Sequence, residues 1–372
     1  MQLVTATIII FLVFAIQKYL YVRFWDKGLD ATCRFSRDFI ECGESADLKL
    51  VVTNDKNLPL PIFQMKFSLD RSLKFDDMQN AAITDKYHKN EVFALNGRQK
   101  VTRKVSFTGR ERGVVELNNV SMIVKDFFMT QTFAKVINEN DIIYVFPKKK
   151  TDVPFNMFFH GVIGNIETRR SLIEDRLTFR GIRQYQPHDG LRAINWKQSA
   201  KSRELMVNVR GYTMDCEVRI LLNLDTNSMV EAERLMEEAI SIASSCVRRI
   251  INAKMAVSLY VNAEDTWGRE IKDTGSGADV AHAITIDKAL TEIKHTLGIE
   301  PFLNRLDQET KEASDNIHYL IISSYHKDDL IEKVDRLHNQ GAGVTMVVPY
   351  YDAYPYDADR PYITGWEVPI NA

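Results

Sequence analysis

The pattern of hydrophobic and polar residues changes twice along the chain. Residues 3–16 are almost all apolar. Residues 28–150 contain stretches in which apolar and polar positions alternate, which is the period of strands with one buried face. From about residue 217, short apolar runs alternate with segments in which apolar residues recur at helical spacing. The pattern therefore predicts a hydrophobic helix, then an all-β region, then an α/β region.

The first region, residues 1–25, is predicted to be a membrane anchor. Leu3 to Val22 reaches the length of about 20 residues that a spanning helix needs if Lys18 extends its amine to the interface. Aromatic residues typical of membrane interfaces accompany its end: Tyr19, Tyr21 and Trp25. A cleaved signal peptide is the alternative, but its basic residue would precede the apolar run, and here the cations follow it. The positive-inside rule then predicts a single-pass protein of the cell membrane, with its N-terminus outside and its soluble domains in the cytoplasm.

Residues 28–150 are predicted to form a β-sandwich of the immunoglobulin-like kind. Phe63 to Leu69 alternates between apolar and polar residues, and so does the stretch around Leu50. Val115–Leu117 and Val120–Val124 are expected to be two strands joined by an Asn-Asn turn. Short strands separated by Gly, Asn, Asp and Pro turns are typical of a sandwich, a domain that usually binds or spaces.

Residues 211–372 are predicted to form an α/β domain with a parallel sheet and helices on both of its faces. Val218 to Leu224 is an apolar run of the kind that is buried on both sides in such a sheet. A helix is expected at Asp287–Leu297, and Pro349 is expected to end the last strand, with the tail packed back on a surface. Residues 151–210 are expected to be a connector between the domains.

Composition and charge narrow the class of function. The chain has 372 residues, is 45% hydrophobic, and carries a net charge of -2, which is typical of a globular protein with two or three domains and gives no reason to expect a nucleic-acid partner. The four cysteines form no Cys-x-x-Cys pair, so a zinc site is not expected. Cys33 and Cys42 are spaced so that they can face each other across a hairpin, and a reducing compartment would leave them as thiols.

The least ordinary stretch is residues 179–209, in which basic and aromatic residues are interleaved. A Pro-His-Asp-Gly sequence at its centre indicates a turn. In one interpretation, the turn presents Asp189, Arg192 and Asn195 to a partner or a ligand. In the other, Arg183 and Arg192 pair with acids such as Asp189 and hold a linker against the next domain, as structural ion pairs commonly do.

The stretch resembles the hallmark of the "domain of unknown function 58" family, with the pattern Arg-x-Tyr-x-Pro-x-Asp-x-x-Arg-x-Ile-Asn-Trp-x-x-Ser-Ala. The matching residues are Arg183, Tyr185, Pro187, Asp189, Arg192, Ile194, Asn195, Trp196, Ser199 and Ala200. His188 departs from the pattern, because the family usually has Gly there. Elsewhere, residues 109–113 are similar to the family's Arg-Gly turn, and Asp126-Phe127-Phe128 is similar to its Asp-Pro-Phe element, with Pro absent.

The resemblance implies an architecture and a partner. The fold expected is a multidomain one: a transmembrane helix, a β-sandwich, and an α/β domain of the Rossmann type that is similar to a von Willebrand A domain. The partner implied is a MoxR-type AAA+ ATPase, which would bring the ATP. The residues expected to form the interaction motif are Arg183, Tyr185, Asp189, Arg192, Asn195, Trp196 and Ser199.

The first α/β strand ends at Asp225, where a von Willebrand A domain places Asp-x-Ser-x-Ser to hold Mg²⁺. This chain has Asp225-x-Asn227-x-Met229, and Met229 is not a ligand for a hard cation. Ser323-Ser324 ends a later strand where such domains usually supply Asp. The site therefore resembles a degraded one, no cofactor is expected, and Asp225 or Asn227 is expected to cap the next helix instead.

The motifs of nucleophilic hydrolases, P-loop proteins and zinc proteases do not occur in the sequence. We therefore expect a membrane-anchored, non-enzymatic adaptor. One alternative is an enzyme or ligand-binding protein that uses His188, Asp189, Arg192 and Asn195 as a polar cluster. Another is an extracytoplasmic adhesion domain, which a Cys33–Cys42 disulfide would support.

Overall fold

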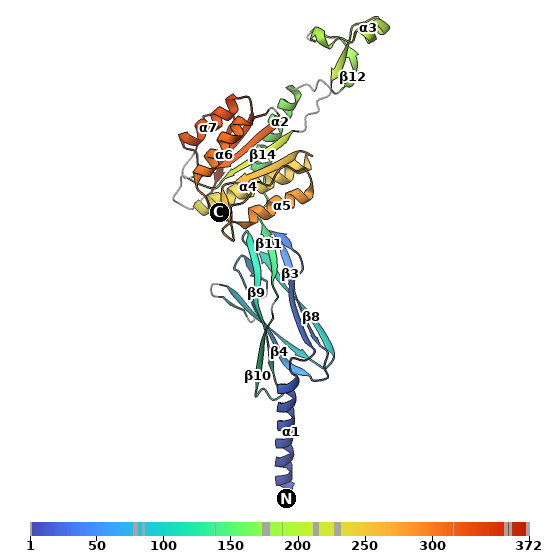
Figure 1. Cartoon of the computed structure of the whole chain (residues 1–372), viewed down its shortest axis with the longest axis vertical. Coiled ribbons are helices and arrows are strands. Elements are labelled where there is room, and N and C mark those ends of the chain that lie inside the picture. Colours follow the sequence, from blue (N-terminus) through green and yellow to red (C-terminus); the bar gives the residue numbers. More distant parts are fainter. Residues whose placement is uncertain are drawn as a thin grey trace. The chain divides into compact units, whose positions relative to one another are not determined.

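The computed structural model describes residues 2–76, 81–83, 86–137, 139–172, 179–187, 189–210, 216–226, 232–314, 316–352, 356 and 359–369. The chain divides into two compact units, Met1–Lys148 and Lys149–Ala372. The first unit holds helix α1 and the antiparallel strands, and the second holds the parallel sheet with its helices (Figure 1).

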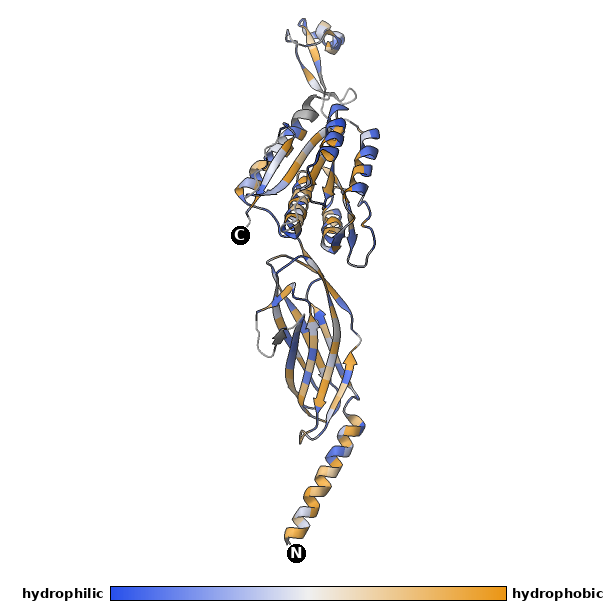
Figure 2. Cartoon of the chain, turned by 90° about the vertical axis from the view of Figure 1, so that its left-hand side faces the viewer, coloured by the Kyte–Doolittle hydropathy of each residue, from blue (hydrophilic) through white to orange (hydrophobic). Residues whose placement is uncertain are grey.

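Helix α1 (Gln2–Phe24) is apolar along most of its length (Figure 2). Its segment Leu3–Phe24 is long and apolar enough to cross a membrane, a criterion that a signal sequence also meets. Tyr21 differs from its neighbours, because only 2% of it is exposed and its hydroxyl donates to the Pro59 carbonyl at 2.6 Å. The end of the helix is therefore fixed to the strands that follow.

Two sheets enclose one hydrophobic core in the first unit, which makes it a β-sandwich. The first sheet has the order β1-β3-β8-β5, with β1 (Leu29–Phe35), β3 (Ser45–Asn54), β8 (Gln99–Gly109) and β5 (Leu73–Phe75). The second has the order β2-β11-β9-β4-β7-β6, with β2 (Phe39–Glu41), β11 (Asp141–Phe146), β9 (Gly113–Lys125), β4 (Leu60–Leu69), β7 (Tyr87–Leu95), β6 (Ala81–Ile83), and β10 (Thr132–Ile137) paired to β9. All neighbours are antiparallel except β2 and β11.

Strand β9 corrects the expectation of two strands joined by an Asn-Asn turn, since it runs unbroken from Gly113 to Lys125. Its register against β4 shifts by one residue, because Lys66 pairs with Ser121 whereas Ser68 pairs with Asn118. A β-bulge of one extra residue reverses which side chains point inward. The buried apolar residues of β9 have odd numbers before the bulge (Val115 and Leu117) and even numbers after it (Val120, Met122 and Val124). The change in the sequence pattern therefore indicates a bulge and not a turn.

The cysteines do not pair in the structure. Cys33 lies on β1 opposite Leu50 of β3, whereas Cys42 follows β2, so the two do not face each other across a hairpin. All four cysteines are free thiols. Burial raises the pKa of the Cys33 thiol, which keeps it protonated.

The second unit is built on a five-stranded parallel sheet. Its order is β15 (Ala256–Val261), β14 (Glu217–Asn223), β18 (Ile317–Ser323), β19 (Gly343–Tyr351) and β20 (Ile363–Val368). The helices outside the motif are α2 (Val153–Leu172), α4 (Ala232–Asn252), α5 (Val280–Glu292), α6 (Ile299–Lys311) and α7 (Asp328–Asn339), and a small hairpin is formed by β16 (Ala263–Asp265) and β17 (Ile293–Thr296).

Alternate residues of the strands point into two separate cores. Ile220 and Leu222 of β14 lie in a core with α2, α4 and α5, whereas Leu221 lies in a core with α6 and α7. The sheet is therefore covered on both faces, as Figure 1 shows and as the apolar runs of its strands predict.

Helix α2 differs from the expected connector. Phe155, Phe159, Val162 and Ile166 recur at helical spacing and are all buried in the core that α4 and β14 share. Residues 153–172 are therefore part of the α/β layer, although Gly161, Gly164 and the charges that follow resemble a linker in composition.

Two further boundaries differ from expectation. Helix α5 begins at Val280, because the Asp279 side chain accepts from the His282 N–H at 2.6 Å, and it ends at Glu292 because the next residues pair as β17. Pro349 lies within β19, beyond Val347, the last residue that pairs with β18. Proline is tolerated where a strand has one neighbour only, and the tail adds β20 on the other side.

Candidate functional site

The hallmark motif folds as a small module (Figure 1). Its elements are β12 (Phe179–Gln184), the 3-10 turn η1 (Leu191–Ala193), α3 (Trp196–Ser202) and β13 (Met206–Arg210), and the two strands pair antiparallel. Among the module's described side chains, Ile194, Ser199 and Val207 are buried. Because so few apolar groups are buried, the shape of the module depends on hydrogen bonds.

Arg183 and Asp189 close the first half of the motif. The guanidinium of Arg183 donates two hydrogen bonds to the Asp189 carboxylate, at 2.6 and 2.5 Å. Asp189 also accepts from the Gln186 N–H at 2.8 Å, which fixes the turn between them. The hydrogen bond to Asp189 raises the pKa of Arg183, as a bidentate pair does. This ion pair is the one that the structural interpretation of the motif predicts.

Asn195 closes the second half. Its side-chain oxygen accepts from the Gln198 N–H at 3.0 Å and caps α3, and its amide donates to the Asn208 side chain at 2.7 Å. Ser199 donates to the Asn195 carbonyl at 2.8 Å and accepts from the Met206 N–H at 2.8 Å. The polar groups of Asn195 and Ser199 thereby hold α3 against β13.

Three other side chains of the module, two in η1 and one at the start of α3, point outward. Leu191 is 72% exposed and Trp196 is 68% exposed. Arg192 is exposed too and makes no hydrogen bond or ion pair with any part of the chain that the structure describes. We call Leu191, Arg192 and Trp196 the outward face. Exposed cations flank it in sequence: Lys197, Lys201 and Arg203.

The proposed polar cluster of an enzyme does not assemble from the described residues. Asp189 pairs with Arg183 rather than with Arg192, and Asn195 serves as a helix cap. Tyr185 is half-buried, with its N–H donating to the Leu205 carbonyl at 2.8 Å. The prediction for His188 lies outside the described residues.

The carboxyl ends of β14, β15 and β18 meet in a closed amide network. Asn223 donates to the Ser323 hydroxyl at 2.8 Å and accepts from the Asn262 amide at 2.7 Å. Asn262 accepts from the Leu224 N–H at 2.9 Å and donates to the Gly298 carbonyl at 2.7 Å. The three side chains are fully buried, so their hydrogen-bonding capacity is used within the protein.

Asp225 lies at the edge of this network and is half-buried, with one carboxylate oxygen accepting from the Thr226 N–H at 2.9 Å. The predictions for Asn227 and Met229 lie outside the described residues. Within the ranges that the structure describes, no three His, Cys, Asp or Glu side chains gather closely enough to hold a metal ion. The described strand ends supply Asp225 with amide and hydroxyl neighbours that are already hydrogen-bonded, a weak donor set for Mg²⁺.

The interpretation of the sequence missed the amide network and one member of the outward face. The network has a signal, because a polar residue follows the apolar run of each of three strands: Asn223, Asn262 and Ser323. Leu191 has none, since an isolated leucine in a turn is indistinguishable from a core residue before the module's fold is known.

Comparison with known proteins finds likeness to β domains over about a third of the chain. No protein-family profile and no curated protein matches the chain. A non-cellulosomal cohesin from the archaeon Archaeoglobus fulgidus is 13% identical, covering 31% of this chain and 91% of its own, with a TM-score of 0.23. A CARDB domain from Pyrococcus furiosus, in complex with di-metal ions, is 15% identical, covering 32% and 93%, with a TM-score of 0.21. A type II cohesin from Acetivibrio cellulolyticus is 9% identical, covering 31% and 94%, with a TM-score of 0.24. Scores this low carry no inference about function.

Proposed function

We propose that this chain is a membrane-anchored, non-enzymatic adaptor of the "domain of unknown function 58" type, which binds a MoxR-type AAA+ ATPase through the outward face of its motif module. The α/β unit, in this proposal, is a von Willebrand A-like scaffold without a working metal site. ATP belongs to the partner, and the process served is the assembly or remodelling of other proteins at the cell envelope.

One observation carries the proposal. The motif's hydrogen-bonding side chains Arg183, Asp189 and Asn195 are used inside the module, while Leu191, Arg192 and Trp196 are left exposed. A catalytic cluster would gather its polar groups around a cavity. Here the polar groups hold the module together, and apolar and cationic side chains are exposed, which is typical of a binding surface.

The outward face indicates the chemistry of its partner. Trp and Arg are the residues most enriched in the energetic centres of protein interfaces. Residues 179–210 carry seven basic and two acidic residues, whereas the whole chain has a net charge of -2. A complementary partner would offer an apolar pocket for Trp196 within an acidic surface, and attraction between the charges would speed the encounter.

The amide network supports the non-enzymatic part of the proposal. Asn223, Asn262 and Ser323 occupy the sheet edge where ligands of open α/β folds are bound, and their side chains bind one another. Burial and a hydrogen bond to Asp329 raise the pKa of nearby Tyr325 to about 12. That hydroxyl is therefore neutral at pH 7 and is not a general base.

Helix α1 supports the membrane part. We infer that it spans the bilayer with its N-terminus outside, because Lys18, Arg23 and Lys27 follow the apolar run and cations of this kind favour the cytoplasmic side. The soluble units would then lie in the cytoplasm, where ATP is available to the partner.

Trp196→Ala is expected to weaken binding of the ATPase about 30-fold, corresponding to about 2 kcal/mol for a residue at the centre of an interface. Because Trp196 is 68% exposed, its removal leaves the module folded. The measurement is a titration of the ATPase against the full chain in detergent micelles. Arg192→Glu is expected to weaken binding as well, and more strongly at low salt.

Trp267→Ala is the matched control, because Trp267 is 45% exposed in the same unit but outside the motif module. The Trp267→Ala variant is expected to bind the ATPase with the same affinity as the unaltered chain. If Trp196→Ala and Arg192→Glu both bind with unaltered affinity, the outward face is not the binding surface. Asp189→Ala is unsuitable as a sole test, since it breaks the ion pair that shapes the turn.

A further inference from the structure

The turn between β9 and β10 exposes three apolar side chains in a row. Phe127 is 57% exposed, Phe128 is 47% exposed and Met129 is 61% exposed. Isolated apolar residues on a surface are ordinary, but a contiguous apolar tip indicates a binding surface. We call residues 126–131 the apolar turn.

Several polar groups of the apolar turn are hydrogen-bonded to one another. Asp126 is fully buried, and its carboxylate accepts from the Gln131 N–H at 2.7 Å and from the Thr130 hydroxyl at 2.6 Å. The Met129 N–H donates to the Asp126 carbonyl at 2.9 Å, and the Asp126 N–H donates to the Gln131 carbonyl at 3.2 Å. Backbone that is hydrogen-bonded internally can enter an apolar medium at lower cost.

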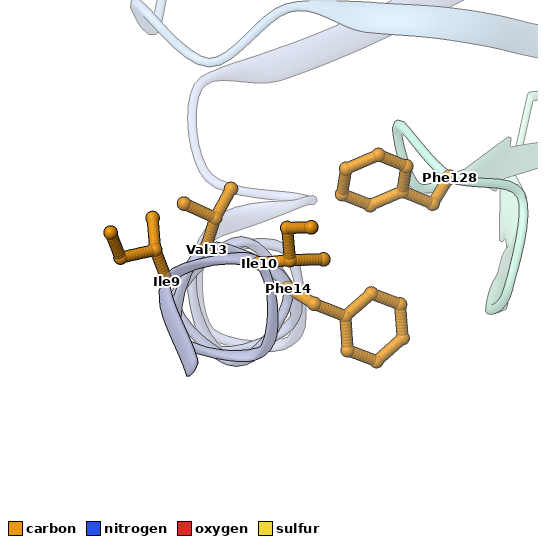
Figure 3. A pocket seen from close by; sticks show the side chains of 5 residues that line it. All are labelled: Ile9, Ile10, Val13, Phe14 and Phe128. Carbon is orange, nitrogen blue, oxygen red and sulfur yellow. The ribbon is translucent and has the colours of Figure 1, made fainter. Parts of the chain in front are cut away.

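The apolar turn lies against helix α1. Gln17 donates to the Asp126 carboxylate at 3.2 Å, and the rings of Phe14 and Phe128 lie 5.8 Å apart. An open groove of about 450 Å³ is lined by Ile9, Ile10, Val13, Phe14 and Phe128. Figure 3 shows Phe128 on the side of α1 that carries Ile10 and Phe14. The groove is apolar and is continuous with the segment that is long and apolar enough to cross a membrane.

The length of α1 sets the depth of the turn. Leu3–Ile16 spans about 21 Å at 1.5 Å per residue, which is less than the ~30 Å hydrocarbon core. If the membrane boundary lies at Gln17, Phe14 is about 4.5 Å inside it. If it lies at Val22, where α1 reaches a full span, Phe14 is about 12 Å inside it. Both boundaries place Phe128, beside Phe14, on the membrane side.

We propose that the apolar turn is a second membrane-contact element, with Phe127, Phe128 and Met129 inserted among the phospholipid acyl chains that also fill the groove beside α1. This inference rests on the proposed spanning role of α1. A helix that enters the bilayer alone can rotate and tilt against the sandwich. A helix and a turn that enter together, joined by Gln17 and Asp126, hold the sandwich in one orientation on the membrane surface.

The test is the depth of single labels in phosphatidylcholine–phosphatidylglycerol vesicles. The full chain is first changed by Cys42→Ser and Cys216→Ser, since Cys33 and Cys246 are buried. An environment-sensitive fluorophore is then attached through Phe128→Cys, Phe11→Cys or Phe39→Cys. Phe11 is the positive reference on α1, 72% exposed. Phe39 is the matched negative reference. It pairs with Tyr144 of β11, which in turn pairs with Val114 near the start of β9, whereas the apolar turn follows the end of β9.

Phospholipids that carry a nitroxide on the acyl chain are expected to quench the labels at 128 and 11 to a similar extent and to leave the label at 39 unquenched. If the label at 11 is quenched and the label at 128 is not, the turn stays outside the bilayer and the inference is wrong, while the anchor stands. If the label at 11 is not quenched either, α1 does not span, and both proposals are wrong.

Discussion

Asp287→Ala is expected to lower the free energy of unfolding of the α/β unit by about 3–5 kcal/mol, because removing one partner of a buried ion pair leaves the other charge uncompensated. Asp287 is fully buried. Its carboxylate accepts from the Lys149 amine at 2.9 Å and from the Ser244 hydroxyl at 2.5 Å, and it lies 3.3 Å from the Arg248 guanidinium. Hydrogen exchange of the α4 and α5 amides in the full chain measures the loss.

Two controls separate this effect from a general loss of charge. Lys149→Met combined with Asp287→Leu removes the two most buried charges and leaves Arg248, whose side chain is 35% exposed, so it is expected to restore most of the stability. Glu332→Ala breaks an exposed pair with Arg336, and is expected to change the free energy of unfolding by less than about 0.5 kcal/mol. If Asp287→Ala has as small an effect as Glu332→Ala, the ion pair does not anchor the start of the unit.

Phe155→Ala is expected to destabilise the α/β unit by about 3–5 kcal/mol through the cavity it leaves. Phe155 is fully buried, and its ring lies 6.2 Å from Phe159, 6.1 Å from Trp366 and 4.9 Å below the Arg249 guanidinium. It therefore joins α2 to α4 and to the last strand of the sheet. Urea unfolding followed by hydrogen exchange in α4 gives the magnitude.

Met157→Ala is the matched control on the same helix, since Met157 is 71% exposed. Its effect is expected to stay within about 0.5 kcal/mol, as is usual for surface substitutions. Equal, small effects from both variants would mean that α2 is a linker, as its composition indicates, and not a layer of the core.

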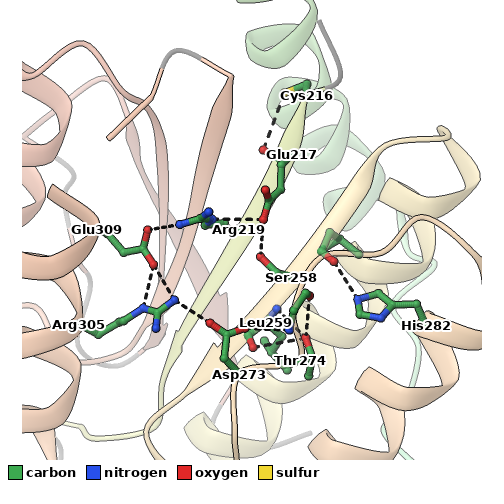
Figure 4. A network of polar contacts seen from close by, with 12 residues as sticks. Cys216, Glu217, Arg219, Ser258, Leu259, Asp273, Thr274, His282, Arg305 and Glu309 are labelled. Atoms are coloured by element: carbon green, nitrogen blue, oxygen red, sulfur yellow. Dashed lines mark hydrogen bonds and ion pairs between the residues drawn. The ribbon is translucent and has the colours of Figure 1, made fainter. Parts of the chain in front are cut away.

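Another polar network fixes α6 to the opposite face of the sheet. Arg219 of β14 donates to Glu309 of α6 at 2.7 Å and to Glu217 at 3.2 Å, while Arg305 joins Glu309 to Asp273 (Figure 4). Glu309 is nearly fully buried between two guanidinium groups. Glu309 thereby links α6 directly to β14 and, through Arg305, to Asp273 in the loop after β16.

Strong, regular patterns in the sequence predicted their elements. The apolar run Val218–Leu224 corresponds to the buried strand β14 (Glu217–Asn223), and the alternation around Leu50 and from Phe63 to Leu69 marks sandwich strands. The misses have physical causes outside local pattern. A bulge changes the phase of β9, tertiary pairing ends α5 to form β17, and α2 is helical because its apolar stripe meets a core that lies far along the chain.

The sequence singled out the stretch that forms the motif module but not the contacts within it. Arg183 and Arg192 are equally plausible partners of Asp189 by sequence, and the structure pairs Arg183. Asn195 caps α3 through the Gln198 N–H and donates to the side chain of Asn208, thirteen residues away, a partner that local sequence does not reveal. Contacts between side chains at such separations are set by the tertiary fold.

Binding of a MoxR-type AAA+ ATPase to the full chain tests the central claim most directly. The chain is reconstituted in lipid nanodiscs, and the ATPase is titrated with ATP, with ADP and without nucleotide. We predict saturable binding that depends on the nucleotide and weakens with rising salt, because the motif module is basic. If hydrogen exchange shows that the chain is folded and the ATPase does not bind with ATP, with ADP or without nucleotide, the adaptor function is contradicted.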